Sequence, residues 1–273
     1  MKIIKLFFKE IPLMFKMGAD SKISNSSKTI LSYLGIGLFF ATWWIISAIG
    51  IVSDKALPSP IKVFSSFPYL FTEKHLLLNT GFSLGVNVLG YLEAVALALP
   101  LGFLMGLFAF FNYTMSKPVD TARFLPLPIM TSIFVFTFGL TYGVKVHFLA
   151  VGIFVYLLPV VVQRIMEVDE TLKQTMWTLG ATKWQMFRKV YLPSVLSKIS
   201  IDIIVLIAIS WTYIVVAEMI YNTGGVGALA NNVRNESRYD ALYAILLLVL
   251  IVGYIQDKLL RMGERRLFKW KYV

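Results

Sequence analysis

The chain has 273 residues, of which 58% are hydrophobic and 15% are charged, with a mean hydropathy of +0.73 and a formal net charge of +11. A soluble domain averages about 45–50% apolar and about 25% charged residues, so the composition excludes an ordinary soluble protein and indicates long segments inside a bilayer. The absence of cysteine excludes disulfides and thiolate metal sites. In a membrane protein such a positive charge indicates Lys and Arg retained on the cytoplasmic side rather than a nucleic-acid partner.

The N-terminal segment, residues 1–28, is basic and precedes the first long apolar run. It carries six lysines among apolar residues such as Ile3, Leu6 and Phe8, which fits either an amphipathic helix on the inner leaflet or a flexible tail. The apolar run that begins at Thr29 is long enough to cross a bilayer. We therefore expect a membrane span there and no cleavable signal peptide.

Six long apolar runs within residues 29–260 predict six membrane-spanning helices and an all-α fold. The second run contains Pro100, so we expect one long, tilted and kinked span there, with a re-entrant pair of helices as the alternative. A short amphipathic helix on the outer surface is expected within Asp54–His75, because apolar residues recur there at helical spacing. The predicted spans are Thr29–Val52, Leu76–Ser116, Phe124–Val144, Phe148–Gln163, Ile203–Ile220 and Ala241–Gln256.

The basic residues are distributed unevenly over this six-span arrangement. With the N-terminus inside, segments on the inner side hold 20 of the 26 Lys and Arg residues, and outer segments hold 6. Because Lys and Arg accumulate on the cytoplasmic side of membrane proteins, both termini are predicted to be cytoplasmic. The same rule places the basic tail 261–273 and the polar segment 165–198 in the cytoplasm.

The polar stretch Glu170–Pro193 lies between two long apolar runs and has the pattern of two short helices. Leu172, Met176 and Leu179 fall on one face of the first helix. Gly180 follows its predicted end, as a glycine commonly does after a helix. This pattern favours a docking surface over a simple connector.

The second short helix is predicted from a capping signal and an aromatic face. Thr182, followed three residues later by Gln185, forms a capping-box pattern for a helix start. Trp184 and Phe187 lie on the apolar face of this helix. Pro193 is expected to limit its length, because proline removes a helical hydrogen bond.

The same stretch resembles the cytoplasmic signature of ABC-importer permeases, in which a glycine is followed by an aliphatic residue and Leu-Pro. The matching positions here are Gly180, Val190, Leu192 and Pro193. The surrounding LGATKWQMFRKVYLP is similar to the nitrate/taurine/sulfonate branch of that family. Three further motifs resemble this branch in the same order: Leu57-Pro58-Ser59-Pro60, Ala217-Glu218-Met219 and Gly225-Val226-Gly227.

The chain departs from the family signature at one point. Where the family usually has Glu-Ala-Ala, this sequence has Gln174, Thr175 and Met176. A neutral amide can form hydrogen bonds but no ion pair with a basic ATPase surface. Glu170 lies four residues before Gln174, on the same helical face, so we expect Glu170 to supply part of the missing charge.

The resemblance implies a six-span polytopic helical bundle of the type I ABC importer permease kind. It implies that two permease subunits form a central path, that two separate ATPase subunits dock on Glu170–Tyr191, and that a solute-binding protein delivers substrate from outside. The implied substrate is a small anion such as nitrate, taurine, a sulfonate or bicarbonate, or a vitamin precursor. The permease itself is expected to do no chemistry and to need no cofactor or metal.

Two carboxylates and two histidines are candidate site residues. Glu93 lies in the middle of an apolar run, where an ionisable group costs about 2–3 kcal/mol or more and usually faces a cavity or a partner. It is either a pore-facing or helix-pairing carboxylate, or a glutamic acid that is protonated or hydrogen-bonded within the bundle.

For Glu218, near a span end, the resemblance implies a role near the outer gate, and a carboxylate reaching the interface fits equally well. His75 and His147 lie at expected outer boundaries without visible partners, which favours interfacial residues over a metal or catalytic site.

The sequence can also be searched for signs of nucleotide binding and of two other functions, secondary transport and intramembrane catalysis. No phosphate-binding GxxxxGK[ST] occurs, so ATP would have to be hydrolysed by another chain. Gly224–Gly227 has no preceding strand and no following lysine, which favours a turn near the outer gate. A secondary transporter stays open as an alternative, although no clear inverted repeat is visible. An intramembrane enzyme also stays open, with Glu93 as the only ionisable residue in the middle of a span.

Overall fold

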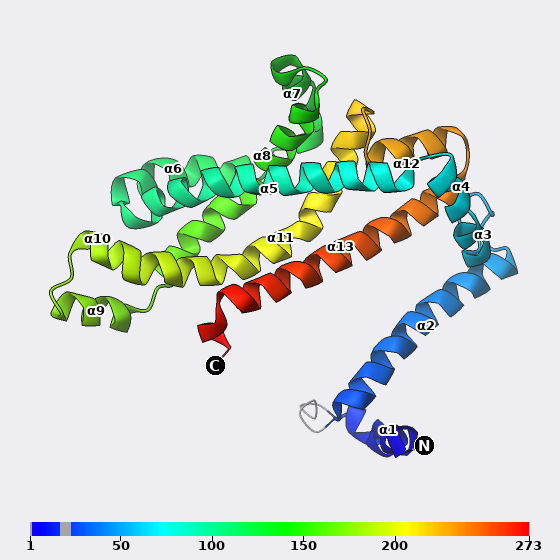
Figure 1. The fold of residues 1–273 in the computed structure, drawn as a ribbon, viewed down its shortest axis with the longest axis horizontal. Coiled ribbons are helices and arrows are strands. Elements are labelled where there is room, and N and C mark those ends of the chain that lie inside the picture. Colours follow the sequence, from blue (N-terminus) through cyan, green and yellow to red (C-terminus); the bar gives the residue numbers. More distant parts are fainter. Residues whose placement is uncertain (1, 17–22, 273) are drawn as a thin grey trace. The chain divides into compact units, whose positions relative to one another are not determined.

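The computed structural model describes residues 2–16 and 23–272 (Figure 1). These described residues form helices, turns and loops without a strand, which confirms the predicted all-α class. Residues 17–22, within the basic segment 1–28, lie outside the described residues. The chain divides into two compact units, Met1–Phe67 and Pro68–Val273, and each is described by itself.

The first unit consists of α1 (Lys2–Met14), α2 (Asn25–Ile49) and α3 (Pro60–Ser65). Of the two structures left open for residues 1–28, a helix is present over α1. The Glu10 carboxylate accepts hydrogen bonds from the backbone N–H and the hydroxyl of Ser24, at 3.1 and 3.0 Å. Ser24 is also the N-cap of α2, so the end of α1 and the start of α2 share one polar contact.

The Leu57–Pro60 motif has a structural role in this unit. The indole N–H of Trp43 donates to the Pro58 carbonyl oxygen at 3.0 Å. Ser59 caps α3 by accepting from the Lys62 backbone N–H, and Pro60 occupies the first turn, where its missing N–H costs nothing. Where one amphipathic helix was expected between the first two spans, the structure has two short helices, α3 and α4 (Phe67–Thr72).

From Phe67 onward the helices run along a bundle, with the α9–α10 segment at one end and α12 at the other (Figure 1). They are α4 (Phe67–Thr72), α5 (Leu76–Leu107), α6 (Ala109–Ala122), the 3₁₀ turn η2 (Leu127–Met130), α7 (Thr131–Phe138), α8 (Tyr142–Met166), α9 (Glu170–Thr178), α10 (Lys183–Met186), the π-helical turn η3 (Phe187–Tyr191), α11 (Leu192–Tyr221), α12 (Val226–Asn235), α13 (Tyr239–Leu267) and the 3₁₀ turn η4 (Lys269–Lys271).

The core of the bundle is the pairing of α5 with α8, with α11 packed against α8. Small residues on α5 allow this close approach. A Cβ at Gly102 would lie 2.3 Å from the Val161 side chain, and a Cβ at Gly106 would lie 2.7 Å from that of Ile165. Any larger residue at either position would therefore push α5 and α8 apart.

Five helices among the described residues are long and apolar enough to cross a membrane. They are α2, α5, α8, the continuous helix Lys183–Tyr221 and α13. A sixth crossing results if α6 and the η2–α7 segment, which are bent by 92° relative to each other, count as one broken span. The described residues thus contain the predicted six spans if this broken span is counted as one of them.

The second predicted span, Leu76–Ser116, is too long. α5 ends at Leu107, Phe108 has extended backbone angles, and α6 then returns beside α5 and α8 (Figure 1). The Asn112 side chain holds the turn by donating to the Met105 carbonyl oxygen at 3.2 Å. Gly106 lies two residues earlier, but it packs against Ile165 within α5, and no charge or proline lies beside Phe108, so the apolar pattern does not mark this turn.

The predicted spans Phe124–Val144 and Phe148–Gln163 also have the wrong bounds. Gly139 ends α7 at φ 69° and ψ −177°, backbone angles that glycine adopts readily, and α8 then begins at Tyr142. Lys145 and His147, which lie at or next to the expected turn between these two spans, are inside α8, where Lys145 donates to the Gly224 carbonyl oxygen in the α11–α12 loop and His147 contacts Glu93 of α5. The fifth and sixth spans, α11 and α13, extend beyond both of their predicted ends.

Candidate functional site

The first helix of the polar stretch, α9, is a short helix with an exposed apolar surface. Asp169 caps it by accepting from the Thr171 backbone N–H at 2.7 Å. None of its described residues is buried. Leu172 is 50% exposed and Trp177 is 52% exposed, so the predicted apolar face does not pack into the core of the chain.

Gly180 ends α9 in the way the sequence predicted. Its φ is +73°, in the left-handed region. The Ala181 N–H donates to the Met176 carbonyl oxygen at 3.0 Å, which closes the helix end in a Schellman-type turn. A Cβ at Gly180 would meet no atom within 4 Å, so the requirement for glycine comes from the backbone conformation and not from lack of space.

The capping box that starts α10 is confirmed. The Gln185 backbone N–H donates to Thr182 Oγ1 at 3.3 Å, and the Thr182 backbone N–H donates to Gln185 Oε1 at 2.8 Å. Both bonds satisfy N–H groups that a helix start leaves without helical partners. The orientation of α10 is therefore fixed by local chemistry.

The prediction that Pro193 ends the second helix is wrong. α10 continues through the π-helical turn η3 into α11 as one helix of 39 residues. The Leu192 N–H donates to the Phe187 carbonyl oxygen, five residues back. Pro193 lies in the first turn of α11 directly after this wide turn, and a π-helical turn accommodates the proline ring and its missing donor.

The aromatic face of the second helix is divided between the bundle and the surface. Phe187 lies edge-on against Phe103 of α5, with ring centroids 5.2 Å apart. Trp184 stacks on Phe187 at 5.5 Å and is 65% exposed. Phe187 therefore contacts α5, and Trp184 extends the same aromatic surface outward.

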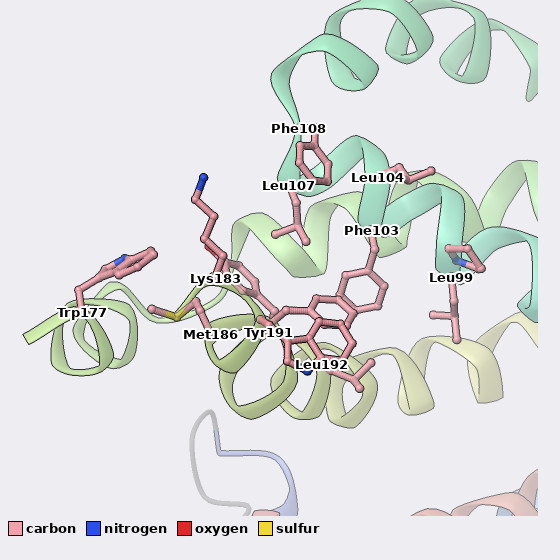
Figure 2. Close-up of a pocket in the computed structure, with 13 residues that line it drawn as sticks. Leu99, Phe103, Leu104, Leu107, Phe108, Trp177, Lys183, Met186, Tyr191 and Leu192 are labelled. Carbon is pink, nitrogen blue, oxygen red and sulfur yellow. The ribbon is translucent and has the colours of Figure 1, made fainter. Parts of the chain in front are cut away.

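An apolar groove of about 1000 Å³ lies between the end of α5 and the start of the α10–α11 helix (Figure 2). Its lining is aromatic and aliphatic, with Lys183 as the one charged side chain. Trp177 from α9 and Phe108 from the α5–α6 turn lie at its two sides (Figure 2). Residues of the polar stretch and of the core helix α5 therefore line the same groove.

Glu170, expected to supply part of the charge that is missing at Gln174, is paired within its own helix. The Glu170 carboxylate pairs with Lys173 within α9, and this hydrogen bond raises the pKa of the Lys173 ammonium group. The Glu170 side chain is still 68% exposed. Gln174 and Thr175 are exposed on the same short helix, and Met176 is half-buried. The proposal that Glu170 replaces the missing family glutamate stays a prediction.

The candidate gate residue Glu218 lies at the α12 end of the bundle and is fully buried. Its carboxylate accepts from the Ser83 hydroxyl, at 2.7 Å to Oε1 and 2.9 Å to Oε2. Its Oε2 also accepts from the Gly227 backbone N–H at 2.9 Å. The carboxylate therefore holds α5, α11 and the start of α12 together and does not reach the interface.

The glycine turn Gly224–Gly227 wraps around this carboxylate, which agrees with the expected turn. The Gly225 N–H donates to Asn79 Oδ1 at 2.9 Å, and the Val226 N–H donates to the Ser83 hydroxyl at 2.9 Å. Gly225 has φ +98°. We call Asn79, Ser83, Lys145, Glu218 and Gly224–Gly227 the polar knot.

Lys145 is a member of the polar knot that the sequence analysis missed. Its side chain is fully buried, its ammonium donates to the Gly224 carbonyl oxygen at 2.6 Å, and it lies over the Phe82 ring at 4.5 Å. The sequence feature that could have identified Lys145 is its position between Val144 and Val146. A lysine inside an apolar run is costly unless it is paired, so it indicates a buried partner rather than a turn.

Glu93 and His147, considered separately in the sequence, form a pair across α5 and α8. Nδ1 of His147 lies 2.9 Å from both Glu93 carboxylate oxygens. The His147 ring lies against Phe138 of α7, with centroids 4.5 Å apart. The other histidine, His75, occupies the N-cap position of α5 in a left-handed conformation, without a capping hydrogen bond from its side chain. Among the described residues, no group of three or more His, Asp or Glu side chains could hold a metal ion.

Comparisons with known proteins agree with this architecture. A family model described as "Binding-protein-dependent transport system inner membrane component" matches residues 98–269. The chain is 28% identical over 234 residues to SsuC of Bacillus subtilis (strain 168), named as an aliphatic sulfonates transport permease protein, and the match covers 86% of this chain and 85% of SsuC. It is 23% identical to the taurine transport system permease protein TauC of Escherichia coli (strain K12), over 90% of this chain and 91% of TauC. A solved structure of the inward-facing MetNI methionine ABC transporter has a similar fold, with a TM-score of 0.62, 19% identity, and coverage of 72% of this chain and 98% of that one.

Proposed function

Since this chain belongs to the family of inner membrane components of binding-protein-dependent transport systems, we propose that its α9–α10 segment is the surface on which separate ATPase subunits dock. We call Glu170–Tyr191 the docking segment. The chain is a transport permease of the ABC importer class and not an enzyme. The proposal therefore concerns how this permease is driven.

The observation that carries the proposal is a capped but exposed apolar element at one end of the bundle. Leu179, beside Gly180, is 75% exposed, and Trp177 and Trp184 lie on the same segment. The caps at Asp169 and Thr182 fix both short helices. Exposed apolar side chains on a preorganised element are typical of a protein–protein contact.

Orientation and subunit composition are part of the proposal. The distribution of Lys and Arg supports a cytoplasmic docking segment, within residues 165–198, and cytoplasmic flanks 1–28 and 261–273. The α12 end, with the polar knot, is then the outer end, where a solute-binding protein delivers substrate. Two permease subunits, in a homodimer or a heterodimer, form the path between two ATPase subunits.

We assign two roles along the path. The polar knot around Glu218 forms part of the outer gate, because it ties α5, α8, α11 and the α12 turn together at that end. The Glu93–His147 pair faces the path or another protein surface rather than lipid, since two ionisable side chains that are each about a third exposed would be costly against lipid tails.

The proposed substrate is a small anion or zwitterion bearing a sulfonate group. The names of SsuC and TauC, which refer to aliphatic sulfonates and taurine, support this class. We expect uptake of taurine or butanesulfonate into proteoliposomes that contain the chain, its ATPase and its binding protein. Uptake should require ATP and the ATPase subunit. Equal uptake without the ATPase would contradict the proposal and would indicate a secondary transporter.

A further inference from the structure

The two helices that flank the docking segment are tied together by one arginine. Arg164 lies in the last turn of α8. Its Nε donates to Asp202 Oδ2 at 2.7 Å and its Nη2 donates to Asp202 Oδ1 at 2.8 Å. Asp202 belongs to α11, 38 residues further along the chain. This is a two-bond guanidinium–carboxylate pair, the geometry that holds the two groups in a fixed orientation.

The same cluster reaches the link that leads into the docking segment. Nη1 of Arg164 donates to the Glu167 carboxylate at 2.6 Å. Lys198 of α11 donates from Nζ to the Glu167 backbone carbonyl oxygen at 2.8 Å. We call Arg164, Glu167, Lys198 and Asp202 the clamp. Its bonds join the point where the chain leaves α8 to the helix by which the chain returns.

The position of the clamp is important because the two ends of the docking segment are connected to the bundle in different ways. The α10 side is continuous with α11 through η3. The α9 side has no buried residue of its own and joins α8 through the short link Glu167–Asp169. A movement imposed on the docking segment reaches α11 directly, and α8 is tied to α11 by packing along the bundle and, next to the docking segment, by the clamp.

An exposed ion pair would contribute little, but this one is partly buried and geometrically constrained. The Asp202 side chain is 17% exposed and that of Arg164 is 29% exposed. The guanidinium is held by two carboxylates at once. The end of α8 is therefore fixed relative to α11 more firmly than a single surface pair would allow.

We propose that the clamp is a positioning device that makes α8 and α11 move as one body with the docking segment, so that ATPase movement is converted into movement of the path. This inference rests on the proposed function. Arg164 and Asp202 are positioning residues in it and contact neither ATP nor substrate. Loss of the clamp is expected to separate ATP hydrolysis from transport rather than to prevent ATPase binding.

The test compares Arg164→Gln, Asp202→Asn and the double variant in proteoliposomes with the ATPase and binding protein. The control is Arg261→Gln, which breaks an Arg–Asp pair confined to α13. The measurements are ATPase co-purification, ATP hydrolysis, and uptake of taurine and butanesulfonate per ATP. In each single variant we expect normal co-purification and hydrolysis with uptake per ATP lower by about tenfold. The double variant should be no worse than either single one, because both remove the same link.

Several outcomes would overturn the proposal. They are an unchanged uptake per ATP in the single variants, the same loss in Arg261→Gln, or loss of ATPase binding together with transport. Arg164→Lys keeps the charge without the two-bond geometry and should show the same fall if Arg164→Gln does not insert. A parent chain that neither binds the ATPase nor moves either probe would overturn the proposed function, and the role of the clamp with it.

Discussion

Gly225 lies so close to the Glu218 carboxylate that no side chain fits at position 225. A Cβ placed on Gly225 would lie 2.1 Å from the Glu218 carboxyl carbon, and the φ of Gly225 is +98°. Steric space and backbone conformation thus both require glycine here. This contact explains why the glycine turn and the buried carboxylate occur together in the chain.

Gly225→Ala should therefore disrupt the polar knot. The added methyl group must displace the carboxylate or the turn, so we expect loss of folded permease or a clearly lower melting temperature in detergent. Gly81→Ala on α5 is the matched control, because nothing lies within 4 Å of a Cβ there. A Gly225→Ala variant with the melting temperature of the parent chain would show that the knot is not tightly packed.

Gly180 tests the conformation of the docking segment without a steric effect. Gly180→Val should cost about 1–2 kcal/mol, because an ordinary residue is strained in the left-handed region, and should weaken ATPase co-purification at matched permease levels. Gly180→Asn should be tolerated, since asparagine visits that region more readily. Gly263→Ala, in α13 with open space around it, is the control. Full ATPase binding by Gly180→Val would remove this role.

The Glu93–His147 pair should behave as a unit. Glu93→Gln keeps a hydrogen-bonding group and should preserve expression and uptake. Glu93→Leu and His147→Leu each leave a polar partner unpaired, at a cost of about 1–3 kcal/mol, nearer the low end because both side chains are partly exposed. The double variant should lose less than the sum of the two single losses. Additive losses measured by thermal unfolding and uptake would show that the two residues act independently.

The orientation of the chain can be tested with single cysteines, since the sequence has none. Ser26→Cys and Lys183→Cys lie at exposed positions and should react with an impermeant thiol reagent from the cytoplasmic side only. Asn232→Cys, exposed on α12, should react from outside only. Labelling of Lys183→Cys from outside intact cells would reverse the proposed orientation.

Features that depend on neighbours in the sequence could be predicted. The Thr182–Gln185 capping box and the left-handed Gly180 follow from local hydrogen bonds and backbone sterics, and the structure confirms both. The all-α class follows from the apolar runs. The two short helices of the polar stretch could be predicted for the same reason, because their signals all lie within 24 residues of sequence, from 170 to 193.

Features that depend on distant residues could not be predicted. The turn at Phe108 has no local signal, and Pro193 is accommodated by the π-helical turn before it. His147 lacked a visible partner because Glu93 lies 54 residues away, and Lys145 is explained by a carbonyl oxygen 79 residues away. Such pairings arise only when α5, α8 and α11 pack together.

The most direct measurement is photocrosslinking from the docking segment in the assembled transporter. Leu179→Cys and Trp184→Cys, both at exposed positions, would carry a benzophenone-maleimide, and Leu77→Cys, exposed in the first turn of α5, is the control. We expect adducts with the ATPase subunit from positions 179 and 184 and none from position 77. A co-purifying ATPase that forms no adduct at 179 or 184, or that forms adducts equally from 77, would contradict docking on α9–α10.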